Sequence, residues 1–293
     1  MISVFGSTGN VGGRVAAMLL ESGIAVRAMV RSPQKAEVLK NRGAEIVEGN
    51  MLNVEDVKEA LDRCDGAFLM TPINIASDNY IEEEITIGRN YGHALEDSTI
   101  DHVVHMSVVG AHAKTGIAQF ESKAIIEDAI FASGVDCTFL RPAFFMDNLY
   151  KQMDMIRSQG IISTLLAPDV PIPMVSTEDI AYAVVKSLMR GAKGEKEEYD
   201  ILGGRDYTMD EVADIVSDAV GKNVRYVQMN EDQAHKFFGQ TGMHPVVVED
   251  FIKMFKLMPE VPVEADRMRV YEEFNFEPTS LESMMSTIAG ALV

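Results

Sequence analysis

The sequence has 293 residues, of which 26 are Lys or Arg and 45 are Asp or Glu, so the formal net charge at pH 7 is -19. Such a surface repels nucleic-acid backbones and anionic membranes, so neither is expected as a direct partner, although counting charges does not exclude a local basic patch. Hydrophobic residues make up 47% of the chain, which indicates a globular protein with a sizeable core.

Cysteine content and the start of the chain bear on the cellular setting. Cys64 and Cys137 are too few for a disulfide framework and too far apart for a zinc motif. The chain begins with a strand pattern rather than a signal peptide, and no stretch reaches the run of about 18 apolar residues that spans a bilayer. We therefore expect a reduced, cytoplasmic protein.

The first thirteen residues, MISVFGSTGNVGG, predict a strand, a glycine turn and a helix. Gly6, Gly9 and Gly12 follow the apolar run 1–5 at three-residue steps. Apolar residues then recur at helical spacing, at Val11, Val15, Met18 and Leu19. Such glycines permit a tight reversal and the close approach of a diphosphate to the N–H groups at the positive end of the helix. The motif predicts a dinucleotide site, and the alternative is a tight turn that binds nothing.

Strand and helix patterns alternate as far as Pro142. Strands are expected at 24–30, 44–49, 66–70, 102–109 and 137–140. Helices are expected after the glycine turn, from 33 onward, and at 53–63, 78–97 and 117–133. Apolar strands separated by helices indicate a parallel sheet covered on both faces, which right-handed crossovers make a doubly wound α/β fold.

After Pro142 the alternation becomes irregular. A helix is expected at 143–159, a proline-bearing loop at 167–173 and a seventh strand at 199–202. Thr208 with Glu211 and Thr279 with Glu282 have the spacing of helix caps. We expect residues 1–150 to form the Rossmann domain and residues 151–293 a smaller substrate-binding lobe, with some segments returning to the sheet.

The end of the second strand indicates which dinucleotide binds. An NAD site usually has an acidic residue there, but this chain has Arg31, whose guanidinium can pair with a 2′-phosphate. Lys35 and Arg14 can add positive charge, so NADP is favoured, with a solvated surface arginine as the alternative. Asn50 is placed to bond the adenine, or it is simply a turn asparagine.

Four motifs in order carry a family resemblance: G-S-T-G-N-V-G, V-R-S-P, T-F-L-R-P-A-F-F-M-D-N and V-S-T-E-D-I-A. Together they resemble the NmrA-like group of atypical short-chain dehydrogenases/reductases. That group includes NADPH-dependent quinone reductases, triphenylmethane-dye reductases and redox-sensing regulators. The resemblance implies an NADP-binding Rossmann domain, a small C-terminal lobe and an active cleft between them.

The resemblance also implies roles for individual residues. Arg31 would meet the 2′-phosphate. Thr71 and Pro72 would lie along the nicotinamide ribose, with Ser107 and Lys123 nearby. The residues that would line the diphosphate are Gly6, Thr8, Gly9, Asn10, Val11 and Gly12.

The catalytic tyrosine of the wider superfamily is missing. It stands four residues before the lysine, where this chain has Gln119 before Lys123. An amide cannot donate a proton as a phenol does, so ordinary carbonyl reduction is not expected. Lys123 binds the ribose or is a surface lysine, and Tyr150 is a second catalytic candidate or a packed aromatic.

A set of mostly apolar side chains is expected to line the substrate pocket, and these candidates are Phe144, Phe145, Asn148, Phe237 and His244. The six histidines show no metal-ligand spacing, so no metal is assigned. The sequence favours an NADPH-dependent oxidoreductase that transfers hydride to a quinone-like or other electron-poor small molecule. The alternative is a non-catalytic NADP(H) sensor acting through a protein partner, and a homodimer is left open.

Overall fold

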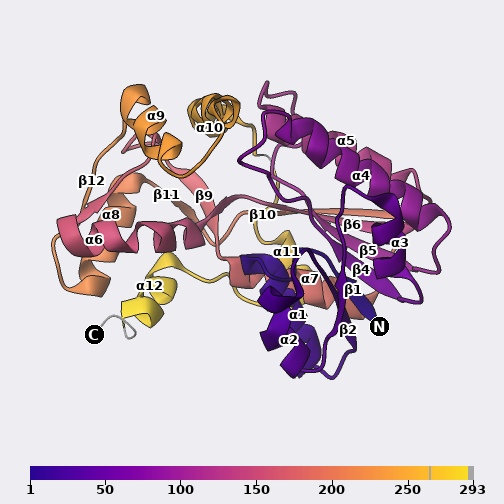
Figure 1. Ribbon diagram of the computed structural model, residues 1–293. Coiled ribbons are helices and arrows are strands. Elements are labelled where there is room, and N and C mark those ends of the chain that lie inside the picture. The colour runs from indigo at the N-terminus through magenta and orange to yellow at the C-terminus, as the bar shows by residue number, and fades with distance from the viewer. Residues whose placement is uncertain (264, 290–293) are drawn as a thin grey trace.

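The computed structural model describes residues 1–263 and 265–289 (Figure 1). In the first half, strands and helices alternate as the sequence predicts. The strands are β1 Ile2–Val4, β2 Val26–Val30, β3 Glu45–Glu48, β4 Gly66–Leu69, β5 His102–Met106 and β6 Asp136–Pro142. The helical segments are α1 Asn10–Glu21, the 3-10 helix η1 Pro33–Ala36, α2 Glu37–Asn41, α3 Val54–Leu61, α4 Tyr80–Glu96 and α5 Ala118–Phe131.

These strands belong to one parallel seven-stranded sheet in the order β10-β6-β5-β4-β1-β2-β3. Strand β10, Lys196–Ile201, comes from the second half of the chain and pairs with the whole of β6. The order reverses at β1, so the carboxyl ends of β1 and β4 flank the position where doubly wound folds bind their ligands. The predicted doubly wound α/β fold is confirmed.

Helices cover both faces of the sheet (Figure 1). One face packs against α1, α7 (Thr177–Arg190) and α11 (Arg269–Phe274), and the other against α3, α4 and α5. Strand β5 supplies both cores, because Val103 faces α4 and α5 whereas Val104 faces α7. This alternation is the two-residue period of a strand, and burial on both faces explains the continuous apolar runs in the sequence.

A smaller lobe follows the carboxyl end of β6 and lies to the left in Figure 1. It contains a sheet in the order β11-β9-β7, a second pair of strands, β12 and β8, and its own apolar core. Its strands are β7 Phe144–Phe145, β8 Ile161–Ile162, β9 Ile172–Val175, β11 Asp206–Tyr207 and β12 Arg225–Tyr226. Its helices are the 3-10 helix η2 Met146–Gln152, α6 Met153–Gln159, α8 Met209–Val220 and α12 Leu281–Ala289.

The single helix expected at 143–159 is wrong. Phe144 and Phe145 form β7 against β9, a 3-10 helix follows, and only Met153–Gln159 is α-helical. Phe144 packs on the core of the lobe and Phe145 on the core of the sheet, and a few apolar residues cannot distinguish this from helical spacing. Strand β9 also occupies the end of the expected loop at 167–173.

Local capping signals were predictive where no distant group competes. The capping box that begins at Thr208 is present. Thr279 does not cap the last helix, because its amide and hydroxyl donate to the Asp179 carboxylate at 2.9 and 2.5 Å. Ser280 instead accepts from the Ser283 amide at 3.1 Å.

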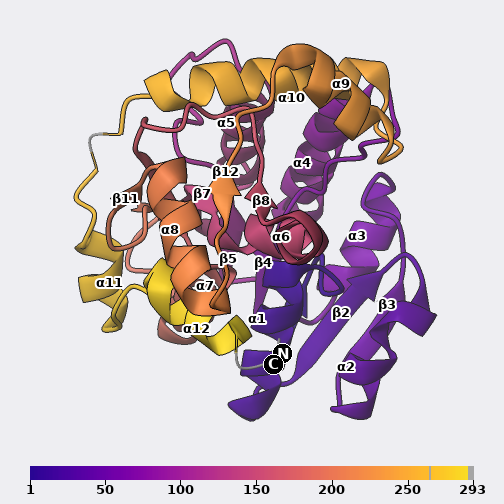
Figure 2. The same cartoon turned by 90° about the vertical axis from the view of Figure 1, so that its left-hand side faces the viewer.

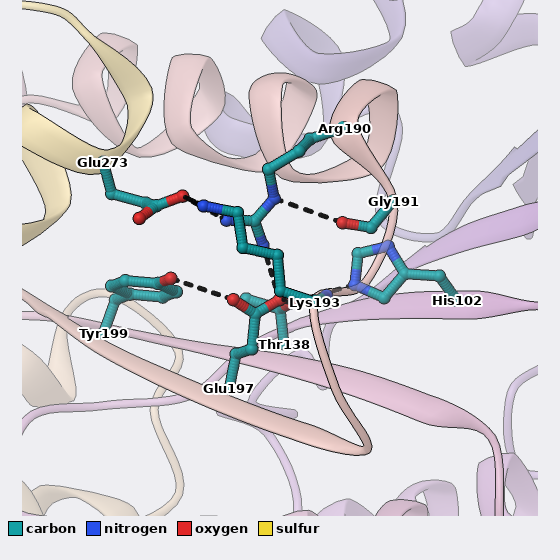
Figure 3. A network of polar contacts seen from close by, with 8 residues as sticks. All are labelled: His102, Thr138, Arg190, Gly191, Lys193, Glu197, Tyr199 and Glu273. Carbon is teal, nitrogen blue, oxygen red and sulfur yellow. Dashed lines mark hydrogen bonds and ion pairs between the residues drawn. The ribbon is translucent and has the colours of Figure 1, made fainter.

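A partly buried polar network joins α7 and α11 to strand β10 of the sheet (Figure 3). Arg190, at the end of α7, donates to Glu273 of α11 at 2.5 Å and to Glu197 of β10. Thr138 of β6 donates to the same Glu197 at 3.4 Å and lies 2.9 Å from the His102 ring. His102 is the first residue of β5, so this network lies at the amino ends of the strands, at the edge of the sheet opposite the glycine turn.

Helices α9 (Glu231–Gly239) and α10 (Pro245–Leu257), followed by the 3-10 helix η3 (Met258–Glu260), cross the top of Figure 2 beside α4 and α5. The Tyr80 hydroxyl donates to Asp250 Oδ2 at 2.9 Å, and the His244 amide donates to the Ile75 carbonyl at 2.8 Å. These bonds tie α10 to the segment after β4, so residues distant in sequence meet at the carboxyl edge of the sheet.

Candidate functional site

The turn between β1 and α1 brings Gly6 against the Met70 side chain and Gly12 against the backbone of Gly6. Gly6 has φ +67°, and a Cβ there would lie 2.6 Å from Met70 Sδ. A Cβ on Gly12 would lie 2.3 Å from the Gly6 carbonyl oxygen. Gly9 is the N-cap of α1 and donates to the same carbonyl at 2.9 Å. Side chains at positions 6 and 12 would therefore push the turn open.

The amino end of α1 is suited to bind an anion. No side chain of the described residues caps the helix, and its first turn has no acidic residue. Thr8 and Asn10 are exposed, whereas Val11 is buried beneath the turn. The free N–H groups and the positive end of the helix dipole thus face outward, which is the arrangement that binds phosphate in dinucleotide-binding proteins.

A cavity of about 650 Å³ opens at this helix end. Its wall opposite the turn is supplied by η2. The lining residues are Gly9, Asn10, Gly13, Arg14, Asp147, Tyr150 and Lys151. Two cations and one carboxylate therefore line the cavity beside the helix end, and this excess of positive charge favours an anion such as a diphosphate over an apolar ligand.

The buried carboxylate of Asp147 fixes this wall. It accepts from the Thr177 amide at 2.8 Å and from the Thr177 hydroxyl at 2.5 Å, at the start of α7. It also lies 3.7 Å from Arg14 Nη2. Partial burial and this carboxylate raise the pKa of the Tyr150 hydroxyl, which is therefore a neutral hydrogen-bond donor. Asp147 and Lys151 were not foreseen, because the sequence does not show that η2 lies against α1.

The predicted adenine end lies at the carboxyl ends of β2 and β3. Arg31 directly follows β2 and is exposed, as is Lys35 one helical turn later. The Asn50 side chain accepts from the Leu52 amide at 3.1 Å, so it makes the turn that was the alternative for this residue.

Lys123 lies in a second polar group at the carboxyl edge. Its Nζ donates to Glu84 Oε1 at 2.6 Å, to the Thr71 hydroxyl, and to the Thr71 carbonyl at 3.4 Å. Glu84 is fully buried, and Ser122 also donates to it, at 3.2 Å. Lys123 is thus an internal residue and not the surface lysine of the alternative. Tyr150 lines the cavity at the glycine turn, and Lys123 is not among the lining residues.

Three buried polar residues near Lys123 have side-chain atoms without a hydrogen-bond partner in the described part of the chain. They are Ser107 Oγ, the whole amide of Gln119, and both ring nitrogens of His105. Burial, with the Lys123 charge, lowers the pKa of His105 to about 3. Ser3, Ser7, His102 and Ser187 elsewhere in the described residues also have such atoms. Unsatisfied buried polar groups are rare in folded proteins, so those beside Lys123 are candidates for contact with a ligand.

The expected substrate-binding residues do not form one wall. Phe144 packs edge-on against Phe255, and Phe145 packs on the core of the sheet. Phe237 of α9 is exposed. Asn148 is half-buried and accepts from the side chain of the residue three positions later. His244 caps α10 with its ring, and Pro72 is half-buried beside Thr71.

One group of side chains has the composition of a metal site. His112, Glu127 and Glu198 offer ligand atoms within 4.8 Å of one another. The Arg141 guanidinium occupies the space between the carboxylates, donating to Glu127 at 2.5 Å and to Glu198 at 2.6 Å. A cation there would displace this ion pair, so we assign no metal to the group. Among the described helices, none has the length and apolar character to cross a membrane.

Comparison with known proteins identifies relatives over nearly the full chain. An NAD(P)H azoreductase from Xenophilus azovorans is 26% identical over 88% of this chain and 87% of its own length. The Citrobacter sp. triphenylmethane reductase complexed with NADP(H) superposes with a TM-score of 0.83 at 20% identity, covering 98% of this chain and 99% of that one. The NADPH-dependent quinone oxidoreductase QOR2 of Escherichia coli, complexed with NADPH, has a TM-score of 0.82 at 18% identity, covering 98% and 99%.

The two solved structures share the fold at low identity, and the family is shown by a different comparison. That comparison is with models of protein families. It confirms the resemblance carried by the four sequence motifs, because the matched residues extend from the glycine turn into α12. A model of the NmrA-like family matches residues 1–285, and the chain therefore belongs to the NmrA-like family.

Proposed function

We propose that the chain binds NADPH at the glycine turn and transfers its hydride to a quinone-like or other electron-poor small molecule. One observation carries the proposal: the amino end of α1, which has no capping side chain among the described residues and carries Arg14, faces Lys151 of η2 across a single cavity. The names of the azoreductase, dye reductase and quinone reductase relatives support the class of reaction. A cytoplasmic setting, which keeps the free thiols of Cys64 and Cys137 reduced, agrees with it.

Each part of the site has a role in this proposal. The N–H groups of the turn and of α1 bind the diphosphate, with Arg14 and Lys151 balancing its charge. Lys123, fixed by Glu84, donates to the ribose hydroxyls in place of Thr71, because Glu84 and Thr71 otherwise take its three N–H groups. When bound, NADPH supplies the hydride. Hydride transfer to an electron-poor molecule needs the two partners held in contact and no side-chain acid, so the replacement of tyrosine by Gln119 is compatible with turnover.

NADPH consumption tests the proposal. Purified protein is mixed with NADPH and with a panel of quinones, azo dyes and triphenylmethane dyes, and absorbance is followed at the nicotinamide band. Consumption above the rate without protein supports the enzyme. Absence of consumption across the panel, together with tight NADPH binding by calorimetry, contradicts it.

The second candidate function is an NADP(H) sensor that acts through a protein partner. It is favoured by the closed bonding of Lys123, whose ammonium already donates to Glu84 and Thr71, and by an amide in place of the usual acid. The same assay separates the two functions, because a sensor binds the dinucleotide without consuming it.

Arg31→Ala is expected to weaken NADPH binding by about 1.5–3 kcal/mol, the value of a hydrogen bond to a charged group, and to leave NADH binding almost unchanged. The reason is that the residue after β2 contacts the 2′-phosphate in this fold, and NADH has no 2′-phosphate. Calorimetric titration with both cofactors measures the difference. Equal loss for both, or no loss, would remove the case for NADP.

Gly12→Ala is expected to abolish tight NADPH binding and to lower stability by about 1–3 kcal/mol, because the new Cβ would meet backbone atoms that no rotamer can move. Gly194→Ala is the matched control, since a Cβ there has no atom within 4 Å. Calorimetry and thermal unfolding of both variants provide the measurements. Similar behaviour of the two variants would show that the turn tolerates a side chain and does not hold a diphosphate closely.

A further inference from the structure

The Gln119 side chain is buried with its hydrogen-bonding capacity unused. It is the second residue of α5 and only 5% exposed, yet neither Nε2 nor Oε1 has a partner among residues 1–263 and 265–289. The Tyr80 hydroxyl lies close to the amide and donates to Asp250 Oδ2, so it offers Nε2 at most one acceptor, and the second Nε2 proton and Oε1 are open to a ligand. An amide kept in this state costs folding free energy, and a ligand that completes its hydrogen bonds would recover it.

The position of Gln119 on α5 places its amide near the other polar residues of the candidate site. Gln119 and Lys123 are four residues apart, so both lie on the same face of α5. Lys123 contacts Thr71, and the preceding residue, Met70, packs against Gly6. A ligand that extends from the glycine turn along the end of β4 therefore leads to the neighbourhood of Gln119. Ser107 directly follows the adjacent β5, and its hydroxyl lies close to the Glu127 carboxylate.

We propose that Gln119 determines the specificity for the molecule that is reduced: its Nε2 donates a hydrogen bond to a carbonyl oxygen of a neutral, planar acceptor. The inference rests on the proposed function and narrows its substrate class to quinone-type carbonyl compounds. An amide has no proton to give at neutral pH, so it anchors the oxygen without protonating it. A quinone then takes one hydride from NADPH and one proton from water, which yields the hydroquinone and NADP⁺.

The substitution Gln119→Leu tests this, because leucine has a similar volume and no hydrogen bond. We compare kcat/KM for a benzoquinone with kcat/KM for a cationic triphenylmethane dye, whose reacting carbon bears no oxygen. The quinone value is expected to fall about tenfold and the dye value to change less than about twofold. The NADPH Kd is expected to stay unchanged. Gln159→Leu, at an exposed position on α6, is the control and should alter none of these values.

Stability of the ligand-free protein gives an independent measurement. Removing an unsatisfied buried amide is expected to raise Tm by about 2–4 °C, whereas removing a structural amide would lower it. An equal loss for quinone and dye together with a lower Tm would assign Gln119 a structural role and overturn the proposal. Unchanged kinetics for both acceptors would also overturn it.

A binding measurement separates this inference from the proposed function. The NADP⁺-loaded protein is titrated with the benzoquinone by calorimetry, for the parent and for Gln119→Leu. If the parent consumes no NADPH, the proposed reaction fails, yet weaker quinone binding by the variant still supports the anchoring role. Equal quinone affinity of the two proteins contradicts that role whether or not turnover occurs.

Discussion

Glu84→Leu is expected to lower the free energy of unfolding by about 3–5 kcal/mol, because it leaves the Lys123 ammonium nearly buried without its carboxylate. The pair is 2.6 Å long, Glu84 is fully buried and Lys123 is 12% exposed. Denaturant unfolding of the variant measures the loss. The double variant Glu84→Leu with Lys123→Met should recover most of it, because a buried ion pair can be replaced by apolar residues at little cost.

The same helix supplies the control for this prediction. Glu82 pairs with Arg89 at 2.8 Å, and both side chains are more than half exposed. Glu82→Leu should therefore cost less than about 1 kcal/mol. If Glu84→Leu lowers the free energy of unfolding by no more than Glu82→Leu does, the buried ion pair stabilises the protein no more than an exposed pair, and Glu84 does not fix Lys123.

Acidification from pH 7 to pH 5 is expected to destabilise the protein by about 2 kcal/mol for each of two buried histidines. Burial lowers the pKa of His102 to about 4 and that of His105 to about 3. An unfolded histidine titrates near 6.5, so below that pH the unfolded state binds more protons and gains stability relative to the folded state. The loss begins as the pH falls through about 6.5 and ends near the pKa of each folded group.

Unfolding free energies at several pH values test this dependence. Between pH 7 and pH 5, the free energy of unfolding of His105→Leu should fall by about 2 kcal/mol less than that of the parent, because one of the two histidines is no longer present to titrate. The ring of His93, which lies in solvent on α4, provides the control His93→Leu. A parent and a His105→Leu variant with parallel curves would contradict the view that the folded protein holds His105 neutral.

Local signals were sufficient for much of the fold. The order of strands and helices up to β6 follows from short apolar runs and their separators, and the capping box at Thr208 involves only adjacent turns. The region 143–159 could not be predicted this way, since β7 exists only because β9 lies beside it. Thr279 likewise bonds to Asp179, a hundred residues earlier, and such a partner leaves no trace in local sequence.

The same division applies to the candidate site. The glycine turn and its free helix end were evident from spacing, whereas the wall formed by Asp147 and Lys151 was not. Glu84 was equally hidden, because it ends a run of three glutamates and the sequence does not show which of them faces α5. Packing selects it, since Glu82 lies in solvent while Glu84 faces Lys123.

The sequence by itself determined the family, the parallel sheet and the place at which a diphosphate is expected, because these depend on residues close together in the chain. Tertiary structure decided which charges are paired, which polar atoms remain without partners, and which segment closes the cavity. Those outcomes arise from contacts between elements distant along the chain, and burial at these contacts sets both the strength of the Lys123 ion pair and the neutral state of His105.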